Sequence, residues 1–131
     1  MRIVGFYAGC LALLYLVLTL RTIVLRGKLK VALGDGKQEP LQRAIRVHAN
    51  FNEYVPIGLI LLFLIASSGS PALLIHGLGI ALLLGRLLHA LGVSRTPEPF
   101  VLRQAGMVLT IGSILVSAGY LLLQFFMFAS V

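Results

Sequence analysis

Four polar residues recur along one face of a helix predicted over about residues 41–66. Arg43, Arg46, Asn50 and Glu53 follow one another at three- and four-residue intervals. At about 100° per residue they fall within roughly 80° of each other, and an almost purely apolar run comes next. Guanidinium, amide and carboxylate groups at the edge of a bilayer are costly unless they line a cavity or meet partners. We therefore interpret this face as a candidate binding site.

Three more polar residues occur where the later helices approach the same end. Arg86 and His89 stand at an i, i+3 spacing late in the third predicted helix, and Arg103 opens the fourth. Arginine forks bind carboxylates bidentately, and Glu53 could accept a hydrogen bond from an ammonium group. Together these groups suit a small anionic ligand that also carries an amine. If that ligand carried a thiol, a nearby arginine would favour the nucleophilic thiolate.

Two simpler interpretations stay open for these residues. Glu53 would serve a purely structural purpose if it formed an ion pair with one of the arginines and so locked the bundle. His89 stands near the C-terminal end of its helix, and its structural interpretation is a favourable interaction with the helix dipole. His48 lies about 160° from Asn50 on the helical wheel, which predicts an interface histidine rather than a ligand.

The elements that must position these side chains are apolar. The chain has 131 residues, of which 59% are hydrophobic and 11% charged, and its mean hydropathy is +1.00; soluble domains are far more polar. Residues 3–20 alone are long enough to cross a hydrocarbon core of about 30 Å. We predict an all-α integral membrane four-helix bundle, a single domain over residues 1–131. Its helices are expected at about 3–25, 41–66, 72–91 and 100–128.

Two boundary features refine this prediction. The first apolar run leads to Arg21 rather than to a small-residue cleavage site, so we expect a retained span and not a cleaved signal. Gly92 is expected to end the third helix, as glycine often does.

The basic residues predict the orientation in the membrane. Of eleven Lys and Arg residues, Arg2 alone lies at the end shared by the termini and the 67–71 turn. The other ten flank or occupy the two remaining connections, and the positive-inside rule places those connections in the cytoplasm and both termini in the periplasm. Basic side chains there would also contact membrane lipid. The polar residues of helices two, three and four converge at this cytoplasmic face.

Other function classes find little support. The net charge of +7 does not indicate nucleic-acid binding, because no basic run is interleaved with aromatics on a soluble element. No metal site is expected, since the three histidines are scattered and Cys10 is the single cysteine. No nucleophile, base and acid stand together in a recognisable set.

Small residues recur at three- and four-residue intervals along the last two helices, where they allow close helix packing in lipid. Such stripes serve equally well within one subunit or between subunits. The small residues are Gly77, Ala81, Gly85, Gly106, Thr110, Ser113 and Ser117, and Tyr120 continues the same spacing.

Three segments carry a family resemblance: residues 43–50 (RAIRVHAN) with Glu53 three residues on, the pattern Gly85-Arg86-x-x-His89, and Arg103. Over essentially the whole chain the sequence resembles the MAPEG family, membrane-associated proteins in eicosanoid and glutathione metabolism, and most closely its small bacterial members. The resemblance implies a homotrimer in the bacterial inner membrane. Glutathione would lie between adjacent subunits near the cytoplasmic side.

The resemblance also implies roles for individual residues. Arg46, Asn50 and Glu53, with Arg43 beside them, correspond to the family's glutathione contacts, and the polar pair of the third helix matches further binding positions. Arg103 resembles the catalytic arginine that stabilises the glutathione thiolate. The implied activity is that of a microsomal-type glutathione transferase or peroxidase acting on a lipophilic electrophile or hydroperoxide.

The chain departs from the pattern at Ala49, where several eukaryotic members have arginine, and at Val93, where they have tyrosine. The alternative function is a non-catalytic trimeric membrane module that binds an anionic lipid or small anionic ligand. A proton-coupled exporter is disfavoured, because the first helix lacks a carboxylate and Glu53 stands near the membrane edge.

Overall fold

Long charge-poor stretches become helices because a helix satisfies its own backbone hydrogen bonds in lipid. The computed structural model describes residues 1–128 and contains α1 (Arg2–Leu29), α2 (Glu39–Ser67), α3 (Ala72–Ser94) and α4 (Phe100–Phe128). Each helix is long and apolar enough to cross a membrane. The predicted all-α four-helix bundle is confirmed, and the chain is an integral, multi-pass membrane protein.

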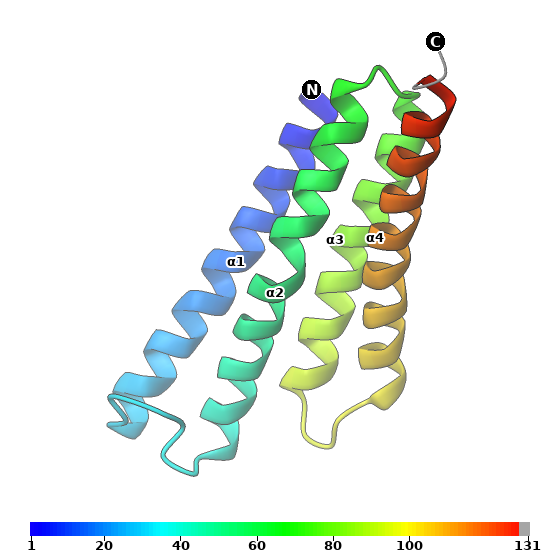
Figure 1. The fold of residues 1–131 in the computed structure, drawn as a ribbon. Coiled ribbons are helices and arrows are strands. Elements are labelled where there is room, and N and C mark those ends of the chain that lie inside the picture. The colour runs from blue at the N-terminus through cyan, green and yellow to red at the C-terminus, as the bar shows by residue number, and fades with distance from the viewer. Residues whose placement is uncertain (129–131) are drawn as a thin grey trace.

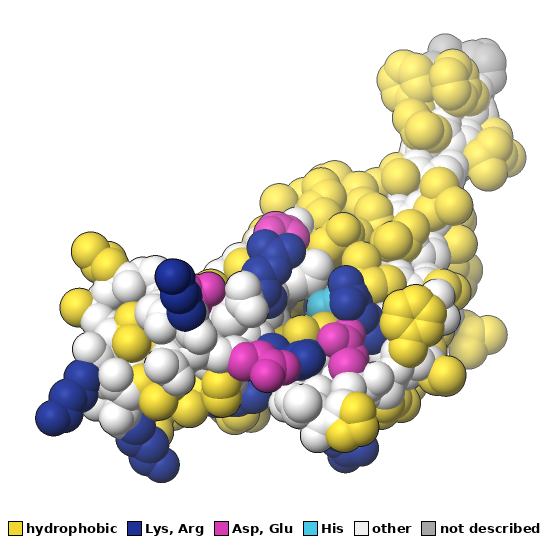
Figure 2. Space-filling view, turned by 90° about the horizontal axis from the view of Figure 1, so that it is seen from below, with side chains coloured by type: hydrophobic (Ala, Val, Ile, Leu, Met, Phe, Trp, Pro, Cys, Tyr) yellow, Lys and Arg dark blue, Asp and Glu magenta, His cyan; other side chains and the backbone are white. Residues whose placement is uncertain are grey.

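The helices run up and down, so that two kinds of connection collect at opposite ends (Figure 1). The N-terminus, the short α2–α3 turn and the end of α4 share one end, and the longer α1–α2 and α3–α4 loops share the other. Seen from the loop end, Lys, Arg, Asp and Glu side chains gather over the loops, while apolar side chains cover the flanks (Figure 2). The charged residues therefore mark one face of the bundle.

Two helix ends differ from the positions that the sequence suggested. α1 continues from the expected residue 25 to Leu29 and ends where Lys30 adopts a left-handed conformation. α3 continues through Gly92 to Ser94, so the expectation that Gly92 ends the helix was wrong. A Cβ atom on Gly92 would stand 2.7 Å from the backbone nitrogen of Arg103. The glycine is needed for close approach of α4, not for a helix cap.

α3 and α4 form the most extensive helix pair, and small residues make their contact possible. A Cβ atom on Gly106 would lie 2.5 Å from the His89 backbone nitrogen and 2.7 Å from the Gly85 carbonyl oxygen. Ser113 donates a hydrogen bond to the Leu78 carbonyl across the same interface, at 3.0 Å. The stripe on α4 thus packs within the protomer.

Only part of the small-residue stripe on α3 packs within the protomer. Gly85 lies against α4, but Gly77 is exposed and has no neighbour within 4 Å of the position of a Cβ atom. The buried glycine in this part of α3 is instead Gly79, which packs against the ring of Tyr7 from α1.

Candidate functional site

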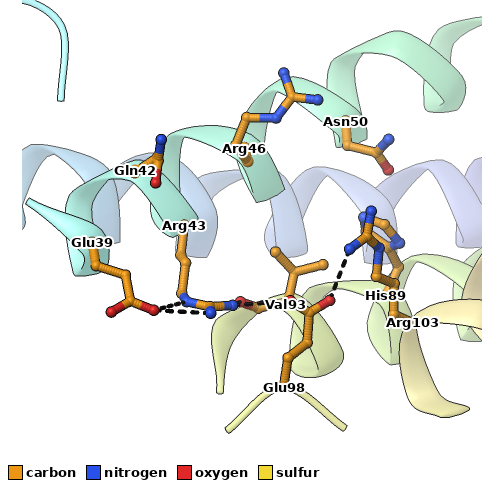
Figure 3. A pocket seen from close by; sticks show the side chains of 9 residues that line it. All are labelled: Glu39, Gln42, Arg43, Arg46, Asn50, His89, Val93, Glu98 and Arg103. Carbon is orange, nitrogen blue, oxygen red and sulfur yellow. Dashed lines mark hydrogen bonds and ion pairs between the residues drawn. The ribbon is translucent and has the colours of Figure 1, made fainter. Parts of the chain in front are cut away.

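A cavity of about 400 Å³ opens at the loop end of the bundle, where α2 faces α3 and the start of α4. This volume is within the usual range of roughly 300–1,000 Å³ for small-molecule sites. Nine residues line the cavity, and all but one are polar or charged (Figure 3): Glu39, Gln42, Arg43, Arg46, Asn50, His89, Val93, Glu98 and Arg103.

An ion-pair network closes one side of this cavity. The Arg43 guanidinium contacts Glu39 at 2.9 Å and Glu98 at 3.0 Å, and it donates a further hydrogen bond to the Val93 carbonyl at 3.2 Å. Glu98 also accepts from Arg103 at 3.0 Å. A single carboxylate from the α3–α4 loop therefore connects α2 to the start of α4.

The charges of the network act on Glu98. Hydrogen bonds from Arg103, and then from Arg43, lower the pKa of the Glu98 carboxyl below its ordinary value of 4.5, because they favour the ionised form. Glu98 is thus held as a carboxylate at neutral pH, and it fixes two of the three arginines of the cavity.

Arg86 lies beneath the cavity rather than in its wall. It is 2% exposed; its Nε donates to Thr110 Oγ1 at 2.9 Å, and a terminal nitrogen donates to Asn50 Oδ1 at 2.7 Å. Its guanidinium also stands 5.3 Å from the centre of the Tyr54 ring. No carboxylate within residues 1–128 forms an ion pair with it. Since Arg86 occupies the amide oxygen of Asn50, it orients the amide nitrogen as a donor.

His89 brings a buried polar atom to the cavity wall. The residue is 6% exposed, and its Nδ1 has no hydrogen-bond partner within the described chain. The close contact of Gly106 with the His89 backbone fixes this side chain beside the start of α4. Buried polar atoms in proteins are normally hydrogen-bonded, so this nitrogen is an exception within the described chain.

Of the seven residues that the sequence singled out, five line the cavity: Arg43, Arg46, Asn50, His89 and Arg103. Arg46 extends from α2 away from the ion-pair network (Figure 3), and Arg86 supports the site from below. Glu53 lies outside the cavity on the exposed side of α2. The considered ion pair between Glu53 and an arginine does not form within residues 1–128.

Four lining residues were not predicted from the sequence: Glu39, Gln42, Val93 and Glu98. Val93 was noted only as a departure from the family pattern. A signal for Glu98 was available, because it is one of only four acidic residues in the chain and stands five residues before Arg103. In so apolar a chain, a carboxylate that close to an arginine suggests an ion pair.

The comparisons with known proteins agree with this architecture. The model of the MAPEG family matches residues 4–123. The chain belongs to the MAPEG family. Two relatives named Inner membrane protein YecN, from Escherichia coli strain K12 and from Escherichia coli O6:H1 strain CFT073, are each 38% identical over 104 residues, which covers 79% of this chain and 78% of theirs. No solved structure matches the chain.

The match over residues 4–123 confirms the family resemblance that the sequence suggested. The structure also shows where the two departures from the family pattern, Ala49 and Val93, lie. Val93 lies in the cavity wall, so this departure changes the lining of the cavity. Ala49 is not a lining residue, and it adjoins Asn50 on α2.

Proposed function

We propose that this protein is a glutathione-dependent membrane transferase or peroxidase of the inner membrane, with the cavity as its thiol site. The observation that carries the proposal is the polar cavity at the loop end, in which Arg46 forms no ion pair within residues 1–128 and Arg103 stands at the edge. Family membership and the inner-membrane relatives support it. The ten basic residues around the two longer loops favour a cytoplasmic position for that end.

The charges of the cavity suit a tripeptide that has two carboxylates and one amine. The cavity is lined by three guanidinium groups and two carboxylates: Arg43, Arg46 and Arg103, with Glu39 and Glu98. One cation therefore stays in excess, and Arg46 has no ion pair within residues 1–128. A free guanidinium can bind a ligand carboxylate bidentately.

In this proposal Arg103 is the group that stabilises the thiolate. It pairs with Glu98 through one terminal nitrogen, and its side chain is 50% exposed at the edge of the cavity. In the transferase reaction the thiol loses its proton to solvent, and the thiolate forms a sulfur–carbon bond while the leaving group departs with its electron pair. A guanidinium beside the sulfur favours the thiolate. The second, lipophilic substrate would reach the site from the membrane.

A homotrimer would provide partners for the remaining charges. Glu53 is exposed within a membrane span and forms no ion pair in residues 1–128, a costly arrangement if it faced lipid. A second copy packed against α2 would remove that cost and complete the site with Glu53. Native mass spectrometry in detergent would give three times the protomer mass.

The test is a glutathione titration of the detergent-purified protein, which follows heat and the ultraviolet thiolate band. We expect saturable binding with a thiolate signal that Arg103→Ala abolishes while some binding remains. Arg95→Ala is the matched control, because Arg95 is exposed in the same loop region and does not line the cavity. A thiolate signal that survives in Arg103→Ala would remove the catalytic role of Arg103.

A specific observation also favours a second candidate, a non-catalytic module that binds a small anionic ligand. Glu98 already pairs with Arg43 and Arg103, so the arginine proposed for catalysis is partly neutralised. Under this alternative, glutathione or another anion binds without thiolate formation. The same titration separates the two functions, and absence of any binding would contradict the glutathione proposal.

A further inference from the structure

A carboxylate of the protein itself occupies two of the arginines in the proposed thiol site. Oε2 of Glu98 lies 3.0 Å from Nη1 of Arg43, and Oε1 lies 3.0 Å from Nη1 of Arg103 (Figure 3). Each oxygen therefore meets a different guanidinium, one from α2 and one from α4. A ligand carboxylate held between two arginines would make the same contacts. Glu98 thus fills a position in which the cavity can hold an anion from outside.

The segment that carries Glu98 has few other attachments to the bundle. The nearest loop hydrogen bonds join the Arg95 nitrogen to the Gly92 carbonyl at 3.4 Å and the Leu102 nitrogen to the Pro99 carbonyl at 3.0 Å. Within the described chain no backbone–backbone hydrogen bond involves residues 96–98, and residues 95–97 are exposed. Exposed segments with few hydrogen bonds open at a low free energy. The two ion pairs of Glu98 are therefore the polar contacts that hold this part of the loop against the cavity.

These ion pairs can be exchanged for contacts with a ligand. The side chains are partly exposed, at 23% for Glu98, 21% for Arg43 and 50% for Arg103, and ion pairs that reach solvent are weak. A ligand carboxylate on Arg43 replaces one ion pair by another, and the released Glu98 carboxylate is solvated by water. A second ligand carboxylate gains a new contact at Arg46, which forms no ion pair among residues 1–128.

We propose that Glu98 is an internal competitor for the thiol site, and that a ligand carboxylate displaces it from Arg43 and so opens the α3–α4 loop. This inference rests on the proposed glutathione function. Displacement also removes the internal counter-ion of Arg103, which then becomes available to the thiolate. Glu98 makes the site selective for the number of anionic groups. A ligand with two carboxylates engages Arg46 and displaces Glu98, whereas a ligand with one binds at Arg46 and leaves Glu98 in place.

The experiment compares glutathione with its glycine monoethyl ester, which lacks one carboxylate, in calorimetric titrations of the detergent-purified full chain. Glu98→Gln keeps the size of the side chain and removes the competing charge. We expect this variant to bind glutathione roughly three- to ten-fold more tightly, because two partly exposed ion pairs no longer have to be broken. The affinity for the ester should change by less than about two-fold, because the ester leaves residue 98 in place.

Glu39→Gln is the matched control for the charge of the cavity. Glu39 also lines the cavity and contacts Arg43 at 2.9 Å, but it belongs to α2 and forms no ion pair with Arg103 within residues 1–128. Its removal changes the net charge as Glu98→Gln does, so its gain should stay within about two-fold for both ligands. Equal gains for glutathione in the two variants would overturn the proposal, because they would reflect the net charge alone.

Opening of the loop is measured separately by limited digestion with trypsin. Arg95 is exposed in the α3–α4 loop, and Lys30, exposed at the end of α1, is the internal reference. Without ligand, the ratio of cleavage after Arg95 to cleavage after Lys30 should rise roughly three- to ten-fold in Glu98→Gln, because the loop has lost its attachment. The ratio should be unchanged in Glu39→Gln. Saturating glutathione should raise it in the unmodified protein.

Two digestion results would overturn the proposal. The first is an equal ratio for the ligand-free unmodified protein and Glu98→Gln, and the second is a ratio that glutathione lowers in the unmodified protein. Failure of the proposed function has a different signature, because then neither the unmodified protein nor either variant binds glutathione. The ligand-free digestion still decides whether Glu98 holds the loop, so the two failures are distinguishable.

Discussion

Replacing Gly106 with alanine tests whether the α3–α4 contact positions the thiol site. The new Cβ atom would lie 2.5 Å from the His89 backbone nitrogen and 2.7 Å from the Gly85 carbonyl oxygen, roughly 1 Å short of ordinary van der Waals separation. Both neighbours are backbone atoms of a helix and cannot rotate away. The helices must therefore separate, which for overpacked sites costs about 1–3 kcal/mol.

The same displacement should reach the ligand. His89 on α3 and Arg103 on α4 face one cavity, and a shift of about 1 Å between groups that act on one ligand weakens binding and catalysis strongly. We expect Gly106→Ala to lower both the melting temperature, by about 3–10 °C, and the affinity for glutathione, although residue 106 does not line the cavity.

Gly112→Ala is the matched control on the same helix. Nothing lies within 4 Å of a Cβ atom at Gly112, so alanine there should be neutral or stabilise the helix by up to about 1 kcal/mol. Thermal unfolding of both variants in the same detergent, followed by circular dichroism, isolates the packing cost as their difference. Equal melting temperatures for Gly106→Ala and Gly112→Ala would refute the close-contact argument.

Two further predictions concern the polar interior and the loop. Thr110→Val leaves Nε of Arg86 without its acceptor and should destabilise the protein by about 1–3 kcal/mol; an unchanged melting temperature would contradict this role. Hydrogen bonds from Arg103 and Arg43 lower the pKa of Glu98 below 4.5, so their stabilisation is present above the unfolded-state pKa and is lost as pH falls through the folded-state value. Melting temperatures of Glu98→Gln, measured from neutral pH to about pH 3, should lack that acid-dependent step, which is small because the ion pairs are partly exposed. A pH profile identical to that of the unmodified protein would contradict the role of Glu98.

The sequence predicted the parts of the site that follow from helical periodicity. Arg43, Arg46 and Asn50 share a face because about 100° separates successive residues, and the structure places all three in one cavity wall. The same periodicity grouped Glu53 with them, yet Glu53 lies outside the cavity. The helical wheel gives the direction of each side chain from the helix axis. It does not show how far along the helix the cavity extends.

Arg86 illustrates what a one-dimensional pattern cannot distinguish. Its i, i+3 spacing with His89 suggested two ligand contacts, but Arg86 is turned into the bundle toward Thr110 and Asn50. The difference depends on the rotation of α3 against α4, which the glycine contacts at Gly85 and Gly106 determine. The prediction for Gly92 was wrong for the same reason. Gly92 does not end α3; it packs against the backbone of α4, which a pattern of consecutive residues does not show.

The sequence by itself determined that this protein is a four-helix membrane protein of the MAPEG family with its charges at one end. Those properties depend on composition, on the length of apolar runs and on local motifs, all of which are properties of consecutive residues. Only the tertiary structure decided that Glu98 connects Arg43 to Arg103 and that Arg86 supports Asn50 from below. These contacts join loops to helices distant in the chain. Their geometry depends on how closely backbones approach, which is set by packing rather than by periodicity.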